Sequence, residues 1–162
     1  MRGKGRRVER SEIRIRPATQ ADAPFVIGLA PRFGDTQAHW REPGEVAAGT
    51  ARALERALAM PRDDEAVFVA EDGAGVGAGF VYVVTATDFF TNEPVAHVSE
   101  LAATRDGTGA GTALMRAAEA WALARGARYV SLHVNARNER ARAFYERLGY
   151  DLEWYRLTRR LC

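Results

Sequence analysis

The amino-acid sequence predicts one α/β domain built on a mixed β-sheet with helices on both faces. Apolar segments with the two-residue period of strands alternate along the chain with segments that have the 3.6-residue period of helices. A glycine-rich stretch at residues 104–115 stands between a strand segment and a helical segment. The chain has 162 residues, 47% of them apolar, which is enough for a substantial core without disulfides.

The N-terminal part of the chain predicts one strand and two helices. Residues 13–16 alternate Ile and Arg, which is typical of a short half-exposed strand. A helix follows, capped by Thr19 or Asp22. Residues 32–44 predict a loop whose aromatic rings we expect to pack on the core rather than to line a pocket. A second helix is predicted at residues 45–60, where apolar side chains form one stripe.

Three strands are predicted next, at residues 66–70, 76–85 and 95–103. An Asp-Gly pair between the first two indicates a hairpin turn. The loop between the last two strands contains Phe89 and Phe90, which together with Trp40 suggest a partly apolar pocket for an acceptor.

The C-terminal part predicts a helix at residues 109–125 and an alternating strand at 128–134. A short helix then begins at Asn138, which is a favourable N-cap residue. A last strand is predicted at residues 150–157. The predicted order is therefore strand, two helices, three strands, helix, strand, helix and strand.

The glycine-rich stretch predicts a binding site for phosphate or pyrophosphate. Gly107, Gly109 and Gly111 alternate with small residues, so backbone N–H groups can approach a ligand closely. The helix that follows adds unpaired N–H donors and the positive end of its dipole. A tight turn without a ligand is the alternative. A dinucleotide fingerprint fits poorly, because the third glycine comes one position early, and the lysine of a Walker loop is absent.

Charge and composition limit the partners. Residues 1–10 carry five basic residues and one glutamate, so the net charge of +2 for the whole chain leaves −2 on the remainder. We expect residues 1–11 to be a disordered basic extension and residues 12–162 to form the domain, with no nucleic-acid or membrane partner. The only cysteine is Cys162 and the three histidines are scattered, so we expect no metal site. We expect a cytoplasmic protein and leave a homodimer open.

Three separate pieces of the chain resemble the GNAT superfamily of N-acetyltransferases. Residues 13–19, with Asp22, are similar to the opening strand and helix of that family. Residues 101–115 are similar to its acyl-CoA pyrophosphate loop. Residues 138–150, Asn-Glu-Arg-Ala-Arg-Ala-Phe-Tyr-Glu-Arg-Leu-Gly-Tyr, match its Asn…Ala…Tyr-Glu-x-x-Gly-aromatic helix nearly throughout. The resemblance spans roughly residues 12–157.

The resemblance implies a GNAT-like acyl-CoA N-acyltransferase fold, with about six to seven strands in a mixed sheet flanked by four helices. It implies acetyl-CoA as co-substrate and transfer of its acetyl group to a primary amine of a small molecule or peptide, by direct attack in a ternary complex. The residues that it implies for coenzyme binding are Leu101, Ala102, Ala103, Asp106, Gly107, Thr108, Gly109, Ala110, Gly111, Thr112, Asn138 and Tyr145. Backbone N–H groups near Ala102 and Ala103 would polarise the thioester carbonyl.

Two side chains are candidates for the chemistry. The resemblance makes Tyr145 the hydrogen-bond or proton donor to the departing sulfur, although a tyrosine on an apolar helix stripe is otherwise a core residue. Glu100 is the first candidate for the general base that a protonated amine requires. His97 is the second choice, since a residue three positions away lies on the opposite strand face unless a bulge intervenes. Weaker candidates are Asp88, His39 and His133.

One residue departs from the family pattern. Asp106 stands three residues before Gly109, where the family usually has Gln or Arg, and a carboxylate there repels phosphates. Arg105 is a neighbouring cation that can compensate. Binding through backbone amides needs no particular side chain, so we expect coenzyme binding to survive. A GNAT-fold module that binds acyl-CoA as a sensor, or serves as an interaction domain without catalysis, is the alternative function.

Overall fold

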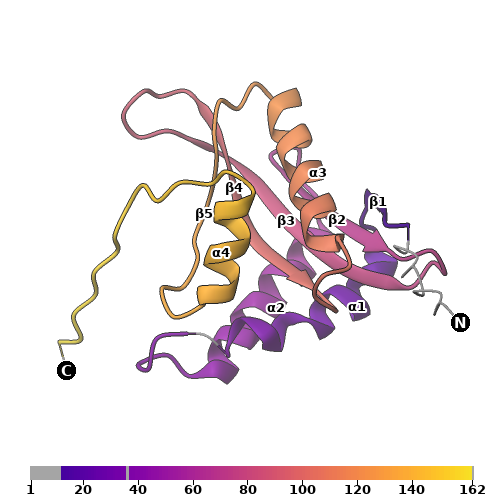
Figure 1. Cartoon of the computed structure of the whole chain (residues 1–162), viewed down its shortest axis with the longest axis horizontal. Coiled ribbons are helices and arrows are strands. Elements are labelled where there is room, and N and C mark those ends of the chain that lie inside the picture. The colour runs from indigo at the N-terminus through magenta and orange to yellow at the C-terminus, as the bar shows by residue number, and fades with distance from the viewer. Residues whose placement is uncertain (1–11, 36, 162) are drawn as a thin grey trace, which may run out of the picture.

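A computed structural model describes residues 12–35 and 37–161 of the chain. These residues form one open five-stranded sheet with the strand order β1-β2-β3-β4-β5 (Figure 1). The strands are Arg14–Pro17 (β1), Glu65–Glu71 (β2), Gly77–Thr87 (β3), Pro94–Ala103 (β4) and Val130–Leu132 (β5). The first four strands pair antiparallel, and β4 and β5 pair parallel, so the sheet is mixed as predicted.

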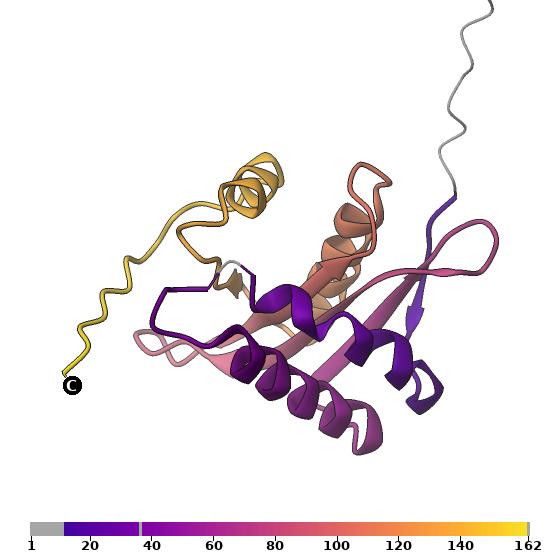
Figure 2. The same cartoon turned by 90° about the horizontal axis from the view of Figure 1, so that it is seen from below.

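Helices cover both faces of the sheet (Figure 2). The helices α1 (Ala23–Gly28) and α2 (Pro43–Ala59) lie on one face, and α3 (Ala110–Ala124) and α4 (Glu139–Arg147) lie on the other. Short 3₁₀ turns, η1 (Gln20–Asp22) and η2 (Ala30–Phe33), flank α1. The four predicted helices are therefore all present.

Each face of the sheet has its own apolar core because side chains alternate along a strand. On β3, Phe80 and Tyr82 pack with the residues of α1 and α2, whereas Val81 and Val83 pack with α3. The core beneath α3 also takes in Phe144 and Tyr145 of α4. We name the two sides of the sheet the α2 face and the α3 face after these helices.

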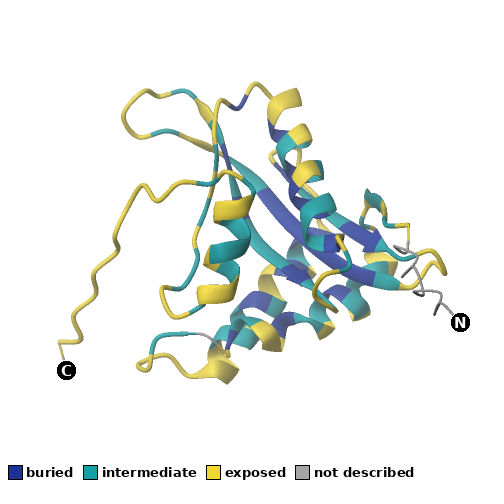
Figure 3. Cartoon of the chain, viewed as in Figure 1, coloured by how far each residue is buried: buried dark blue, intermediate teal, exposed yellow. Residues whose placement is uncertain are grey.

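The prediction of six to seven strands is wrong, because the described residues form five. The segment 150–157, predicted as a strand, pairs with no described strand, and residues 151–161 are exposed throughout (Figure 3). Its apolar side chains meet mostly solvent, with Leu157 92% exposed, and the ring of Trp154 stacks on Phe90. Alternation is a local property, whereas a strand also needs a paired edge beside it. The basic extension predicted at residues 1–11 lies outside the described residues.

Two further strand details differ from the sequence prediction. The strand predicted at residues 128–134 is reduced to the three residues of β5, which are those that pair with β4. A β-bulge lies in β4, where Glu100 pairs with Tyr82 but Val98 pairs with Val83, so Ser99 is the extra residue. This bulge changes which side chains of β4 share a face.

Candidate active site

The centre of the candidate site is the place where β5 leaves β4. Ladder pairs join Ala96, His97 and Val98 to Val130, Ser131 and Leu132, and none of the described residues continues this ladder beyond Val98. The edge of β4 from Ser99 to Ala103 therefore faces a separation between the strands, and its backbone polar groups can bind an extended ligand. Leu101, Ala102 and Ala103, which the resemblance implied for coenzyme binding, lie along this edge.

The glycine loop follows β4 directly and leads into α3. Gly107 and Gly109 have φ values of 71° and 88°, in the left-handed region that glycine adopts most readily. Gly109 is the N-cap of α3, so it brings no capping side chain to the N–H groups of the first turn. A Cβ atom at either glycine would have no neighbouring atom within 4 Å, so the space beside the loop is open. The loop thus meets the requirements for an anion site.

The helix α4 contacts the start of α3 through the ring of Phe144. A Cβ atom at Gly111 would lie 3.3 Å from Cζ of Phe144, so the absence of a side chain there lets α4 approach. Asn138 caps α4, with its Oδ1 accepting a hydrogen bond of 3.1 Å from the N–H of Ala141. Asn138 is thus an N-cap, as the sequence alone suggested, and its side-chain NH₂ donates to none of the described residues.

The hydroxyl of Tyr145 differs from those of the other two tyrosines packed in the fold. Tyr82 donates to Glu65 at 2.6 Å and Tyr150 donates to Glu119 at 2.9 Å. The ring of Tyr145 packs between Phe144 and Tyr150, yet its hydroxyl has no hydrogen-bond partner among the described residues. It is not sealed from solvent either, since no buried side-chain polar atom of the described chain lacks a partner. The hydroxyl is therefore free to donate to a ligand.

Glu100 lies on the α2 face of β4, beside Tyr82. Burial raises the pKa of its carboxyl to about 7, opposed by a hydrogen bond from Thr50 of α2. Burial also raises the pKa of Tyr145 to about 12, and the charge of Glu100 contributes to that rise. Glu100 thus influences the pKa of Tyr145 although the two side chains lie on opposite faces of the sheet. A carboxyl with a pKa near neutrality is suited to accept a proton at physiological pH.

His97 lies on the same face of β4 as Glu100. The sequence analysis placed His97 on the opposite face unless a bulge intervenes, and the structure has such a bulge. His97 lies between Ala96 and Val98, which both pack on the α3 face, so its ring lies on the α2 face. Beyond the bulge at Ser99, Glu100 returns to that same face, opposite Tyr82. The ring of His97 contacts Ser131 at 3.0 Å and lies 4.7 Å from the ring of His133.

Arg140 is a site residue that the sequence analysis missed. Its guanidinium forms an ion pair with Asp106, the carboxylate that departs from the family pattern. The pair joins the glycine loop to the first turn of α4. The two residues are 34 positions apart, and no spacing rule connects them. Arg105, proposed from sequence as the compensating cation, is exposed.

Asp88 and His39, the weaker candidates, have structural roles in the described chain. Asp88 accepts hydrogen bonds from the backbone N–H groups of Phe90 and Thr91 in the β3–β4 turn. His39 packs edge-to-face on Trp40. Phe33 packs on Phe80, which confirms the predicted packing for that ring, whereas Phe89 is 91% exposed.

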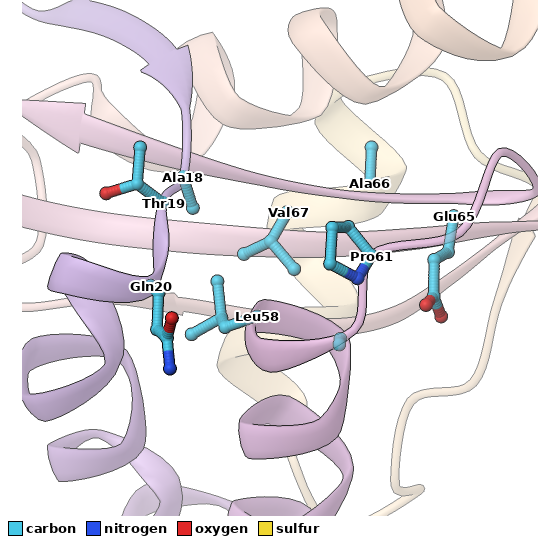
Figure 4. Close-up of a pocket in the computed structure, with 9 residues that line it drawn as sticks. Ala18, Thr19, Gln20, Leu58, Pro61, Glu65, Ala66 and Val67 are labelled. Carbon is cyan, nitrogen blue, oxygen red and sulfur yellow. The ribbon is translucent and has the colours of Figure 1, made fainter.

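A hollow of about 150 Å³ lies elsewhere, between the β1–η1 turn, the end of α2 and the start of β2 (Figure 4). Its lining residues are Ala18, Thr19, Gln20, Ala57, Leu58, Pro61, Glu65, Ala66 and Val67. None of the residues named for chemistry or coenzyme binding is among them. The Glu65 carboxylate at its edge is already held by Arg56 and Tyr82.

Metal clusters and membrane-spanning helices are both absent from the described residues. These residues contain no group of three or more His, Cys, Asp or Glu side chains that could hold a metal ion. None of the helices in that part of the chain is long and apolar enough to cross a membrane.

Comparison with known proteins agrees with this geometry. The model of the acetyltransferase (GNAT) family matches residues 35–150. The chain is 34% identical over 113 residues to an uncharacterized N-acetyltransferase of Methanocaldococcus jannaschii, an alignment that covers 63% of this chain and 48% of that protein. The chain therefore spans about half the length of this curated relative.

Solved structures share the fold at low sequence identity. An aminoglycoside N-acetyltransferase in complex with CoA superposes with a TM-score of 0.73 at 21% identity, covering 94% of this chain and 97% of that one. A ribosomal-protein-alanine N-acetyltransferase from Brucella melitensis gives a TM-score of 0.68 at 18% identity, covering 93% and 100%. With the family match extending over most of the domain, these likenesses lead to one conclusion: the chain belongs to the GNAT family of acetyltransferases.

Proposed function

We propose that this protein transfers the acetyl group of acetyl-CoA to a primary amine of a small molecule or peptide, by direct attack in a ternary complex. The observation that carries the proposal is the unpartnered hydroxyl of Tyr145 on α4, which packs on the α3 face, while Glu100 lies on the α2 face of the open edge of β4. A proton donor and a proton acceptor thus lie on opposite faces of the sheet, where its strands separate. Family membership supports acetyl-CoA as the co-substrate.

The coenzyme would lie along the separation of β4 and β5. Backbone N–H groups from Gly107 to Gly111 are the donors proposed for the pyrophosphate, and the edge at Ala102 and Ala103 is proposed for the pantetheine arm and the thioester carbonyl. The free NH₂ of Asn138 is available to the same arm. This assignment agrees with the open space beside the two glycines of positive φ.

The acceptor amine would approach from the α2 face, where Glu100 lies. An aliphatic amine has a pKa of about 10.4, so only about one part in a thousand is unprotonated at neutral pH. One proton leaves the ammonium for solvent, which frees the lone pair of the nitrogen, and Glu100 would take the other, directly or through water, as the C–N bond forms. The C–S bond then breaks, and Tyr145 donates to the leaving sulfur, which departs as a thiol.

Two solved neighbours act, by their names, on very different acceptors, an aminoglycoside and a ribosomal protein. The acceptor of this chain is therefore proposed only as an amine. The first test is release of free thiol from acetyl-CoA with a panel of amines that includes aminoglycosides and peptides with free N-termini. We expect turnover with at least one amine, and a large loss of kcat in Glu100→Gln. Full activity of Glu100→Gln at every pH would exclude Glu100 as the base.

The departure of Asp106 from the family pattern is the reason for a second candidate function, a non-catalytic sensor of acyl-CoA. It places a carboxylate at the loop proposed for phosphates. A sensor would gain thermal stability with acetyl-CoA but release no thiol with any amine. The same amine panel, read by melting temperature and by thiol release, separates the two functions.

A further inference from the structure

We propose that His97 is a second proton acceptor for the amine, acting through the Nε2 atom that Ser131 leaves unprotonated, beside Glu100 on the α2 face of β4. This inference rests on the proposed acetyl transfer. The bulge at Ser99 places His97 and Glu100 on the same face of β4.

Two protons leave the amine nitrogen during the reaction, so a second acceptor beside Glu100 has a proton to take. A protonated amine has three N–H bonds and the product amide has one, so two protons leave the nitrogen. One of them balances the proton that the departing thiolate takes up, and the other goes to solvent. A single carboxylate can hold only one of these protons at a time.

The hydrogen bonds of Ser131 bear on which ring nitrogen of His97 lacks a proton and is basic. The hydroxyl of Ser131 lies 3.4 Å from the carbonyl oxygen of Ala96 and 3.0 Å from Nδ1 of His97, and its single proton can go to either one. The proposal assigns the Ser131 proton to Ala96, and in that arrangement Nδ1 of His97 donates to the Ser131 oxygen and carries the ring proton. In the neutral ring, Nε2 is therefore the basic nitrogen.

The surroundings keep His97 neutral. Burial lowers the pKa of His97, and the charge of the neighbouring His133 lowers it further. The other groups that bear on this pair of acceptors are Thr50 of α2, which hydrogen bonds to Glu100, and Tyr145 of α4, which is influenced by the charge of Glu100. His133 is exposed, and its ring lies 4.7 Å from that of His97.

The bulge brings the two acceptors together. His97 pairs with Val84 and Glu100 pairs with Tyr82, two residues that are neighbours on one face of β3. Two such positions on a strand are about 7 Å apart. The side chains of His97 and Glu100 can therefore both reach the nitrogen of one amine, directly or through one water molecule.

The proposed sequence of proton transfers is balanced. Nε2 of His97 removes the first proton from the ammonium, which leaves a lone pair on nitrogen. That lone pair attacks the thioester carbon, the C=O π bond opens, and Glu100 removes the second proton. The C–S bond breaks as the carbonyl reforms, and the sulfur is protonated through Tyr145. Tyr145 regains its proton from Glu100, directly or through water, and His97 loses its proton to solvent.

His97→Asn is the variant that tests this role, because the Asn amide can still donate to Ser131 while the basic Nε2 is lost. The acceptor is the amine that gives the fastest thiol release with the wild-type protein. We expect kcat/KM for this amine at pH 7 to fall at least tenfold, with KM for acetyl-CoA unchanged. In a plot of log kcat/KM against pH, the slope of the acid limb should fall by about one, because one proton acceptor has been removed.

His133→Asn is the matched control from the same cluster. Without the charge of His133, the pKa of His97 rises, so the acid limb should move to higher pH while the slope stays that of the wild type. Nitrogen chemical shifts of His97 measured by NMR should show Nδ1 protonated in the wild type, and Ser131→Ala should mix the two tautomers.

The outcomes separate this inference from the proposed function. If the wild type turns over no amine, the proposed function is wrong. If the wild type and His97→Asn have the same rate and the same slope, or if Nε2 carries the proton in the neutral ring, His97 is not the second acceptor, and acetyl transfer through Glu100 stands.

Discussion

The Asp106 carboxylate forms an ion pair with the guanidinium of Arg140, so the glycine loop and the first turn of α4 are joined across the candidate coenzyme site. A loop suited to phosphates thus carries an acid whose charge is offset by a base from another element. Both side chains are largely exposed, at 58% and 70%. The pair therefore contributes little to stability, but it determines the charge that an anionic ligand meets.

Asp106→Asn should strengthen coenzyme binding. The substitution removes the repulsive charge and leaves Arg140 free to approach a phosphate, so we expect Kd for acetyl-CoA to fall about three- to tenfold. Arg140→Gln, which exposes the carboxylate, should raise Kd by a similar factor. Titration calorimetry at two salt concentrations measures both effects, and both should shrink as salt rises. Equal Kd values for the two variants would mean that the pair does not face the ligand.

Glu100 should make the protein less stable as the pH rises. Its pKa is about 7 in the folded protein against 4.5 for a free glutamate, so the folded state favours the protonated form. The group contributes its full share of stability below pH 4.5, and this share is lost as the pH rises through 7. Glu100→Gln should therefore raise the free energy of unfolding by roughly 1–3 kcal/mol at pH 8 and by little at pH 4.5.

Urea unfolding of wild type and Glu100→Gln at the two pH values measures this difference. The same variant should lose most of its kcat, which would mark Glu100 as a residue kept for function at a cost in stability. A variant that is less stable than the wild type at pH 8 would contradict the raised pKa.

Sequence patterns predicted the helices and the first four strands well, because each of these elements carries its own signal. The stripe of α2, the hairpin signal at Asp72 and Gly73, and the N-cap at Asn138 are all local. The segment 150–157 has a comparable alternation but no paired edge beside it, and an edge is a tertiary property that alternation does not encode.

The site was predicted less completely, for the same physical reason. Glycines and motif residues could be named from sequence, but the bulge at Ser99 moved His97 to the face of Glu100, and only strand register reveals a bulge. Arg140 was missed because its partner is 34 residues away. The free hydroxyl of Tyr145 could not be foreseen, since it depends on which carboxylates lie near each tyrosine.

Tyr145→Phe should slow catalysis without unfolding the protein. Its hydroxyl makes no hydrogen bond to the described residues, so its removal should cost less than about 1 kcal/mol of stability. We expect kcat to fall about tenfold, because a thiolate is a fair leaving group even without a donor. Tyr150→Phe is the matched control, since it loses the hydrogen bond to Glu119 and should lower stability more than kcat. Thermal melting and steady-state kinetics of both variants test the contrast, which a reversed pattern would refute.

Gly109→Ala and Gly126→Ala separate backbone strain from ligand binding. The two glycines have φ values of 88° and 77°, and a Cβ atom at either one would meet no atom within 4 Å. Both substitutions should therefore cost about 1 kcal/mol or slightly more, through the left-handed backbone alone. Only Gly109 lies in the glycine loop, so only Gly109→Ala should also raise Kd for acetyl-CoA, by about tenfold, because the methyl group occupies the space beside the loop and the strain displaces its N–H donors. Melting temperatures should fall alike in the two variants, and binding should weaken in one. Equal Kd values for Gly109→Ala and the wild type would place the pyrophosphate away from this loop.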